Sequence, residues 1–166
     1  MRIRIENSIQ QLEDIQFGKL WMGANFSTKI KAIDEKSAFT RPHENLHSVA
    51  EILSHLTLWR KETILKIQTG EGSKTDECEE NWLTNDQLKI VGWQYIKTEY
   101  NNTLTSLIKL LKFKDDAFLD KEYYDTDFKG NYKYSFVING MLHHDIYHLG
   151  QLGIIIKYLK KNKLSS

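Results

Sequence analysis

A single proline, Pro42, occurs among the 166 residues of this chain. Proline breaks helices because its ring clashes with the preceding turn and its nitrogen has no hydrogen to donate. Most of the sequence can therefore run in long helices. No segment shows the sustained alternation of apolar and polar residues that is typical of half-buried strands. The sequence predicts an all-α protein.

Two long helices have clear start signals. Ser48 is followed three residues later by Glu51, and Thr84 by Gln87, and both pairs match the capping box. Polar or glycine-containing stretches predict loops at residues 17–27, 36–48, 69–84 and 124–135. After a short first helix, the long helices are expected from residue 48, from 84 to about 111, and from about 135 to 161. We expect a four-helix bundle, mostly antiparallel, with long connecting loops, in a single domain that spans residues 1–166.

The balance of charges argues against several classes of partner. The chain has 23 basic and 22 acidic residues, so its formal net charge is +1. A protein without an excess of basic residues has no general electrostatic attraction to nucleic acid. The N-terminal residues are charged and contain no long apolar run, so we expect no membrane segment. The lone cysteine, Cys78, excludes an intramolecular disulfide and fits a cytoplasmic location.

The last predicted helix has two histidines in the middle of its apolar stripe. At about 100° per residue, His144 and His148 lie on one face between Met141 and Ile155. Residues four apart on a helix are neighbours, so both rings can turn towards one point. Two imidazoles in this arrangement can chelate one metal ion.

A third ligand has to come from another helix. His43 and His47 precede the Ser48 cap and belong to a loop, and His143 points away from the stripe. His55 remains, inside the helix that starts at Ser48. If the two helices face each other, His55, His144 and His148 form a three-histidine metal site. The alternative is that the three are ordinary polar side chains satisfied in the core or at the surface.

Two segments resemble the DinB-like superfamily, which includes metal-dependent enzymes related to the bacillithiol and mycothiol S-transferases. They are "HSVAEILSHLTLWR" (47–60) and "GMLHHDIYHLGQL" (140–152), and a "GKLWMG"-type loop lies near the N-terminus. The resemblance implies a four-helix bundle, often homodimeric, with one metal-binding histidine in the second helix and two in the last. The implied ligands are again His55, His144 and His148. The family often has arginine after the final histidine, where this chain has Leu149.

A three-histidine site leaves a coordination position open for water or substrate. Two function classes follow. The first is a metal-dependent enzyme acting on a small molecule, either a thiol S-transferase, with a low-molecular-weight thiol as cofactor, or a hydrolase. The second is a non-catalytic metal-binding protein of the same fold. Three imidazoles suit zinc or nickel, and also iron or copper.

Other side chains are candidates for the surroundings of the ligands. Trp59, Glu62 and Gln151 are candidates for orienting the histidines or lining a pocket. For Glu62 the alternative is a position on a solvated helix face, and Gln151 could equally lie on the surface without such a role. The tryptophans Trp21, Trp59 and Trp82 are expected in the core or in pocket walls.

A second apolar flank on the last helix raises the question of a partner. The flank consists of Ile138, Leu142, Leu149 and Ile156. A helix that is apolar over most of its girth is central to its bundle or shared with a second subunit. We expect a homodimer, and the alternative is that the N-terminal helix covers this flank within one chain.

Overall fold

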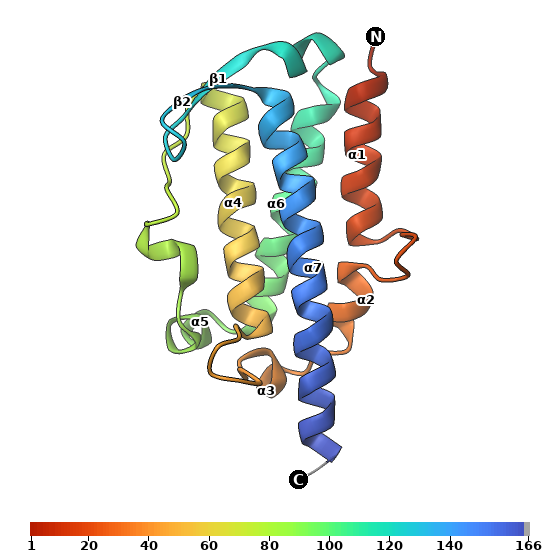
Figure 1. The fold of residues 1–166 in the computed structure, drawn as a ribbon, viewed down its shortest axis with the longest axis vertical. Coiled ribbons are helices and arrows are strands. Elements are labelled where there is room, and N and C mark those ends of the chain that lie inside the picture. Colours follow the sequence, from red (N-terminus) through yellow and green to blue (C-terminus); the bar gives the residue numbers. More distant parts are fainter. Residues whose placement is uncertain (165–166) are drawn as a thin grey trace.

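The fold is a four-helix bundle with short accessory elements, as a computed structural model that describes residues 1–164 shows (Figure 1). The prediction of an all-α four-helix bundle is confirmed. The helices α1 and α7 run in one direction and α4 and α6 in the other, so α4 is antiparallel to α7 and parallel to α6 (Figure 1). The four long helices are α1 (Ile3–Gln16), α4 (Val49–Thr69), α6 (Trp93–Lys112) and α7 (Tyr134–Leu164).

The helix expected from residue 84 to 111 is in fact two helices. Helix α5 (Asn85–Val91) ends at Gly92, and α6 begins directly after it. Gly92 has a φ of 84° and a ψ of 156°, a backbone conformation that is almost restricted to glycine. Both predicted capping boxes are present, at Ser48 with Glu51 and at Thr84 with Gln87.

The segment expected as a loop at 124–135 contains a β-hairpin. Strand β1 (Glu122–Asp125) pairs with β2 (Gly130–Lys133) in antiparallel register, with Tyr123 opposite Tyr132. Each strand has four residues, too few for a clear alternation in the sequence. The remaining elements are α2 (Phe26–Lys31), α3 (Glu35–Ala38) and the 3₁₀ turns η1 (Glu79–Trp82) and η2 (Asp116–Asp120).

The connection between α4 and α5 follows one side of the bundle. It descends from the end of α4 near the hairpin, passes through η1 and reaches α5 at the opposite end (Figure 1). This long return explains why α4 and α6 are parallel. It also covers the face of α4 on which His55 lies, since η1 packs against α4.

The second apolar flank of α7 is buried within the chain. Its four residues Ile138, Leu142, Leu149 and Ile156 are each at most 6% exposed. Helix α1 packs against α7 and contributes buried residues to the same core, as expected from the intrachain alternative. The apolar flank therefore gives no reason to expect a dimer, and the homodimer stays a prediction.

A buried ion pair connects α4 to α7. Arg60 donates to Asp145 over 2.7 Å, and both side chains are fully buried. The same guanidinium also donates to the hydroxyl of Tyr100 over 3.1 Å and to its backbone carbonyl over 3.3 Å. Asp145 follows His144 directly in the chain, so the pair holds the two histidine-bearing helices together beside the predicted site.

Candidate metal centre

The structure brings the three predicted histidines together between α4 and α7. His55 projects from α4, and His144 and His148 project one turn apart from α7. The Nε2 atom of His144 lies 2.9 Å from Nε2 of His55 and 3.0 Å from Nε2 of His148. Among the described residues, these three form a cluster whose potential ligand atoms all lie within 4.8 Å of one another.

Two of the rings are oriented by hydrogen bonds at their other nitrogen. Nδ1 of His55 lies 3.0 Å from the backbone carbonyl of Asn81, and Nδ1 of His148 lies 2.7 Å from Oε1 of Gln151. A carbonyl oxygen can only accept, so both Nδ1 atoms must carry the hydrogen. In the neutral rings both Nε2 atoms then present lone pairs to the centre of the cluster. Such partners are typical of metal-binding histidines.

Burial keeps the cluster neutral. Burial, and to a lesser extent the neighbouring His148 and His55, together lower the pKa of His144 to about 3. Burial also lowers the pKa of His148 to about 4. The pKa of His55 is lowered by burial as well, although the hydrogen bond to Asn81 opposes the change. Neutral imidazole is the form that binds metal ions.

The donor set fits a divalent cation better than it fits a set of ordinary hydrogen bonds. With His55 and His148 protonated at Nδ1, His144 can place at most one hydrogen among the three Nε2 atoms. The nitrogen pair that this hydrogen does not bridge is then left in close contact without a hydrogen bond. A cation at the centre would be attracted by all three lone pairs at once.

Trp82 stacks against the ring of His55. The indole lies 3.9 Å from the imidazole between ring centroids, at an interplanar angle of 6°. On its other face Trp82 stacks with His47 at 3.7 Å. The loop histidine thus belongs to a layer outside the cluster. Together with the Asn81 carbonyl, this stack restricts rotation of the His55 ring.

A cavity of about 700 Å³ opens from the three histidines along α4 and α7. Aromatic side chains line much of it, and its far end lies at the hairpin. The lining residues include Trp59, Trp82, Tyr123, Phe128, Phe136 and Tyr147, together with His55, His144 and His148. A small molecule in this space would lie directly beside the convergent nitrogens.

Of the three side chains that were expected to orient the histidines or line a pocket, two lie at the site and one does not. Gln151 contacts His148, and Trp59 lines the cavity while its indole donates to the side chain of Asn81 over 2.9 Å. Glu62 instead turns to the loop after α4, where it accepts from the backbone of Ser73 and Lys74. It is 3% exposed, so it lies neither on a solvated face nor in the cavity lining.

The sequence did not point to Asn81 as a part of the site. Asn81 orients His55 through a backbone carbonyl, and a carbonyl has no residue-specific signal in a sequence. The predictions for the tryptophans had different outcomes. Trp82 lies in the cavity wall as expected, whereas Trp21 is fully exposed, so the prediction of a buried Trp21 was wrong. Trp21 lies in the loop between α1 and α2, where no helix packs over it.

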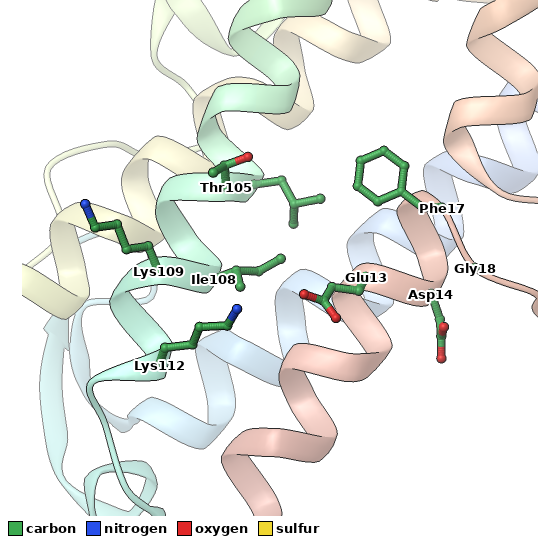
Figure 2. Close-up of a pocket in the computed structure, with 9 residues that line it drawn as sticks. Glu13, Asp14, Phe17, Gly18, Thr105, Ile108, Lys109 and Lys112 are labelled. Carbon is green, nitrogen blue, oxygen red and sulfur yellow. The ribbon is translucent and has the colours of Figure 1, made fainter.

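A second hollow, of about 570 Å³, lies between α1 and α6 (Figure 2). Its walls combine Phe17 and Ile108 with the charged side chains of Glu13 and Lys112, which Figure 2 shows on opposite sides. Its lining contains no histidine and no cysteine. The chemistry of the three-histidine cavity is absent from it.

Among the helices of residues 1–164, none combines the length and apolar character that a membrane crossing requires.

Comparison with known proteins adds a family and a fold. The model of the DinB superfamily matches residues 21–152. The chain is also similar to a solved structure of YfiT from Bacillus subtilis, described as a probable metal-dependent hydrolase with an unusual four-helix bundle topology. The two have a TM-score of 0.65 and 11% sequence identity, over 96% of this chain and 90% of that chain. No curated protein matches the sequence.

Proposed function

This chain belongs to the DinB superfamily, and from that premise we propose that it is a metal-dependent enzyme acting on a small molecule, with His55, His144 and His148 as the metal ligands. The observation that carries the proposal is the convergence of three neutral Nε2 atoms in the wall of a cavity of about 700 Å³. A closed structural site needs no adjoining cavity. An open cavity beside three ligands is the arrangement of catalytic sites.

A divalent ion held there would supply an open coordination position at which the pKa of a bound water or thiol is lowered. The protein side chains have separate tasks. Asn81 and Gln151 hold two imidazoles with their Nε2 lone pairs turned to the centre. Trp59 and Trp82 form walls that exclude bulk water from one side of the cluster. Zinc and nickel are the metals that we expect first for three imidazoles, with iron and copper as alternatives.

Two reactions fit such a site. Hydrolysis is supported by the description of YfiT as a probable metal-dependent hydrolase. Transfer to a low-molecular-weight thiol is supported by the resemblance of the two histidine segments to S-transferases. In the first case water attacks the substrate, and in the second a thiolate displaces a leaving group. We propose a cytoplasmic location for either enzyme, because the single cysteine fits a reducing compartment.

The test begins with untagged protein, because an affinity tag of histidines would itself bind metal. Elemental analysis should find close to one divalent ion per chain. The loaded protein is then assayed with a panel of activated esters and amides, and separately with small thiols and chlorodinitrobenzene. Turnover above the rate without protein in one panel identifies the reaction class.

Two variants separate the site from general effects of losing a histidine. His148→Gln removes a ligand, whereas His143→Gln changes an exposed histidine on the same helix. We expect His148→Gln to lose metal and activity and His143→Gln to keep both. Metal retention by His148→Gln would contradict the assigned ligands. Stoichiometric metal without turnover in either panel would favour the non-catalytic metal-binding alternative.

A further inference from the structure

A polar cluster lies at the end of the cavity that is remote from the histidines. Lys66 is on the same stripe of α4 as His55 and Trp59, eleven residues after His55. Eleven residues of helix correspond to a rise of roughly 16 Å. Lys66 is 4% exposed, lines the cavity, and its Nζ lies 2.9 Å from Oδ2 of Asp125. A buried lysine in a cavity wall is costly, so its presence there needs a reason.

The carboxylate of Asp125 has no capacity left for a ligand. Its Oδ2 atom accepts from Lys66 and, over 2.8 Å, from the hydroxyl of Tyr123. Its Oδ1 atom accepts from the backbone amides of Asp127 and Phe128, over 3.1 and 3.2 Å. Four donors therefore hold this carboxylate in place. It fixes the ammonium group at the end of the cavity.

Lys66, in contrast, has donors to spare. An ammonium carries three hydrogens, and Asp125 is its one hydrogen-bond acceptor within residues 1–164. The group lies 6.0 Å from the ring centroid of Trp59 and 5.6 Å from that of Tyr123, and both rings line the cavity as well. A ligand that reaches this end of the cavity meets N–H donors framed by two aromatic rings.

The charges around this end favour an uncharged acceptor. The positive charge of Lys66 is balanced by Asp125, at 2.9 Å. Two further carboxylates, those of Asp76 and Asp127, line the cavity nearby, and Asp127 holds the backbone amide of Asp76 over 2.8 Å. The formal charge of the four residues together is negative, so an anionic group would be repelled. An amide or ester carbonyl could accept from Lys66 without this repulsion.

The side chains that line the space between the two ends are mostly apolar. Trp59 lies between His55 and Lys66 on α4, and Val137, Met141 and Phe136 line the cavity from α7. At the hairpin Phe128 packs against Phe136 at 5.7 Å between ring centroids. An apolar chain or ring would fill this stretch and displace water from it.

We propose that Lys66, fixed by Asp125 and Tyr123, is a binding site for a neutral carbonyl group at the far end of the substrate. The substrate is then an elongated, uncharged molecule with an apolar middle, whose reactive group lies at the histidines and whose amide or ester lies at Lys66. This inference rests on the proposed function, since it takes the histidines as the reactive end.

The experiment measures affinity and needs no turnover. Zinc- or nickel-loaded protein is titrated calorimetrically with alkyl hydroxamates, whose head group chelates metal ions. The tails vary in length and end in a methyl group, a primary amide or a carboxylate. At the best tail length we expect the amide to bind roughly tenfold more tightly than the methyl compound. The carboxylate should bind no better than the methyl compound.

The decisive variant is Lys66→Met with Asp125→Asn, because the double change leaves no unpaired buried charge. It should bring the amide and methyl compounds within about twofold of each other. The matched control is Lys61→Met with Glu99→Gln, which removes a surface ion pair of 2.7 Å between α4 and α6. The control should keep the full preference for the amide.

Two results would overturn the proposal. The first is that the unaltered protein binds the carboxylate compound more tightly than the others. The second is that the double variant still prefers the amide, which would mean that Lys66 has only a structural role. A different result would count against the proposed function itself. If no hydroxamate binds, not even the methyl compounds, the site has no metal with an open coordination position, and this inference fails with it.

Discussion

The buried pair of Arg60 and Asp145 allows a prediction in which the two single variants behave differently. Arg60→Met leaves Asp145 in the core without a partner, since its Oδ1 already has none among the described residues. Asp145→Ala leaves Arg60 with the hydroxyl and the carbonyl of Tyr100 as acceptors. The guanidinium cannot lose its proton, whereas the carboxylate can gain one.

Removal of one partner from a buried pair typically costs about 3–5 kcal/mol of unfolding free energy. For Arg60→Met a second estimate is available. Burial already raises the pKa of Asp145, and Arg60 opposes this rise. Without Arg60 the carboxyl should be protonated at pH 7 in the folded state. Protonation of a group of ordinary pKa near 3.9 at pH 7 costs roughly 4 kcal/mol, at about 1.4 kcal/mol per pH unit.

The sign of the pH dependence follows from the raised pKa. A folded state that holds a proton which the unfolded state releases becomes more stable, relative to the unfolded state, as the pH falls. Between pH 7 and pH 5 the cost of Arg60→Met should therefore shrink by roughly 3 kcal/mol relative to the unaltered protein. Asp145→Ala should show no comparable change, because the group left behind does not titrate.

Urea unfolding followed by circular dichroism at pH 7 and pH 5 measures these differences. The double variant Arg60→Met with Asp145→Ala completes the cycle and should cost less than the sum of the two single changes. Additive costs would show that the two groups do not interact in the folded state. An equal cost of Arg60→Met at both pH values would refute the reasoning that Asp145 takes up a proton.

Further predictions concern the histidines, Gly92 and the assembly. Because the pKa values of His144 and His148 are lowered in the folded state, the unfolded state binds more protons below pH 6.5. The stability of the metal-free protein, measured by urea titration, should therefore fall from pH 6.5 towards pH 4, by about 1–2 kcal/mol per histidine at pH 5. A stability that does not change with pH would contradict the burial of the two histidines as neutral rings. A chelator should lower the melting temperature of metal-loaded protein, because the ion binds the folded state, and equal melts would argue against a native site. Gly92→Ala should cost about 1–3 kcal/mol through backbone strain alone, since no atom lies within 4 Å of the added carbon, and a neutral result would mean that the break between α5 and α6 can relax. Light scattering should give twice 19.5 kDa if the predicted homodimer forms, and a mass that stays at 19.5 kDa on concentration would mean a monomer.

Local features of the sequence were enough to predict most of the long helices and the candidate metal ligands. Helical spacing, capping boxes and i, i+4 neighbours are local properties, set by a geometry that repeats every 3.6 residues. For this reason the last helix, the start at Ser48 and the common face of His144 and His148 could be read from the sequence. The same local reasoning missed the break at Gly92, because glycine is tolerated in helices and only its conformation shows the interruption.

The faces along which the helices pack could not be predicted in this way. Whether His55 reaches His144 depends on the rotation and offset of α4 against α7, and these are held by contacts such as that of Arg60 with Asp145, 85 residues apart in the chain. Packing also assigned the second flank of α7 to the interior of one chain and turned Glu62 towards the loop after α4. These outcomes depend on the summed packing of many side chains from distant segments, and the periodicity of one helix carries no information about its partner.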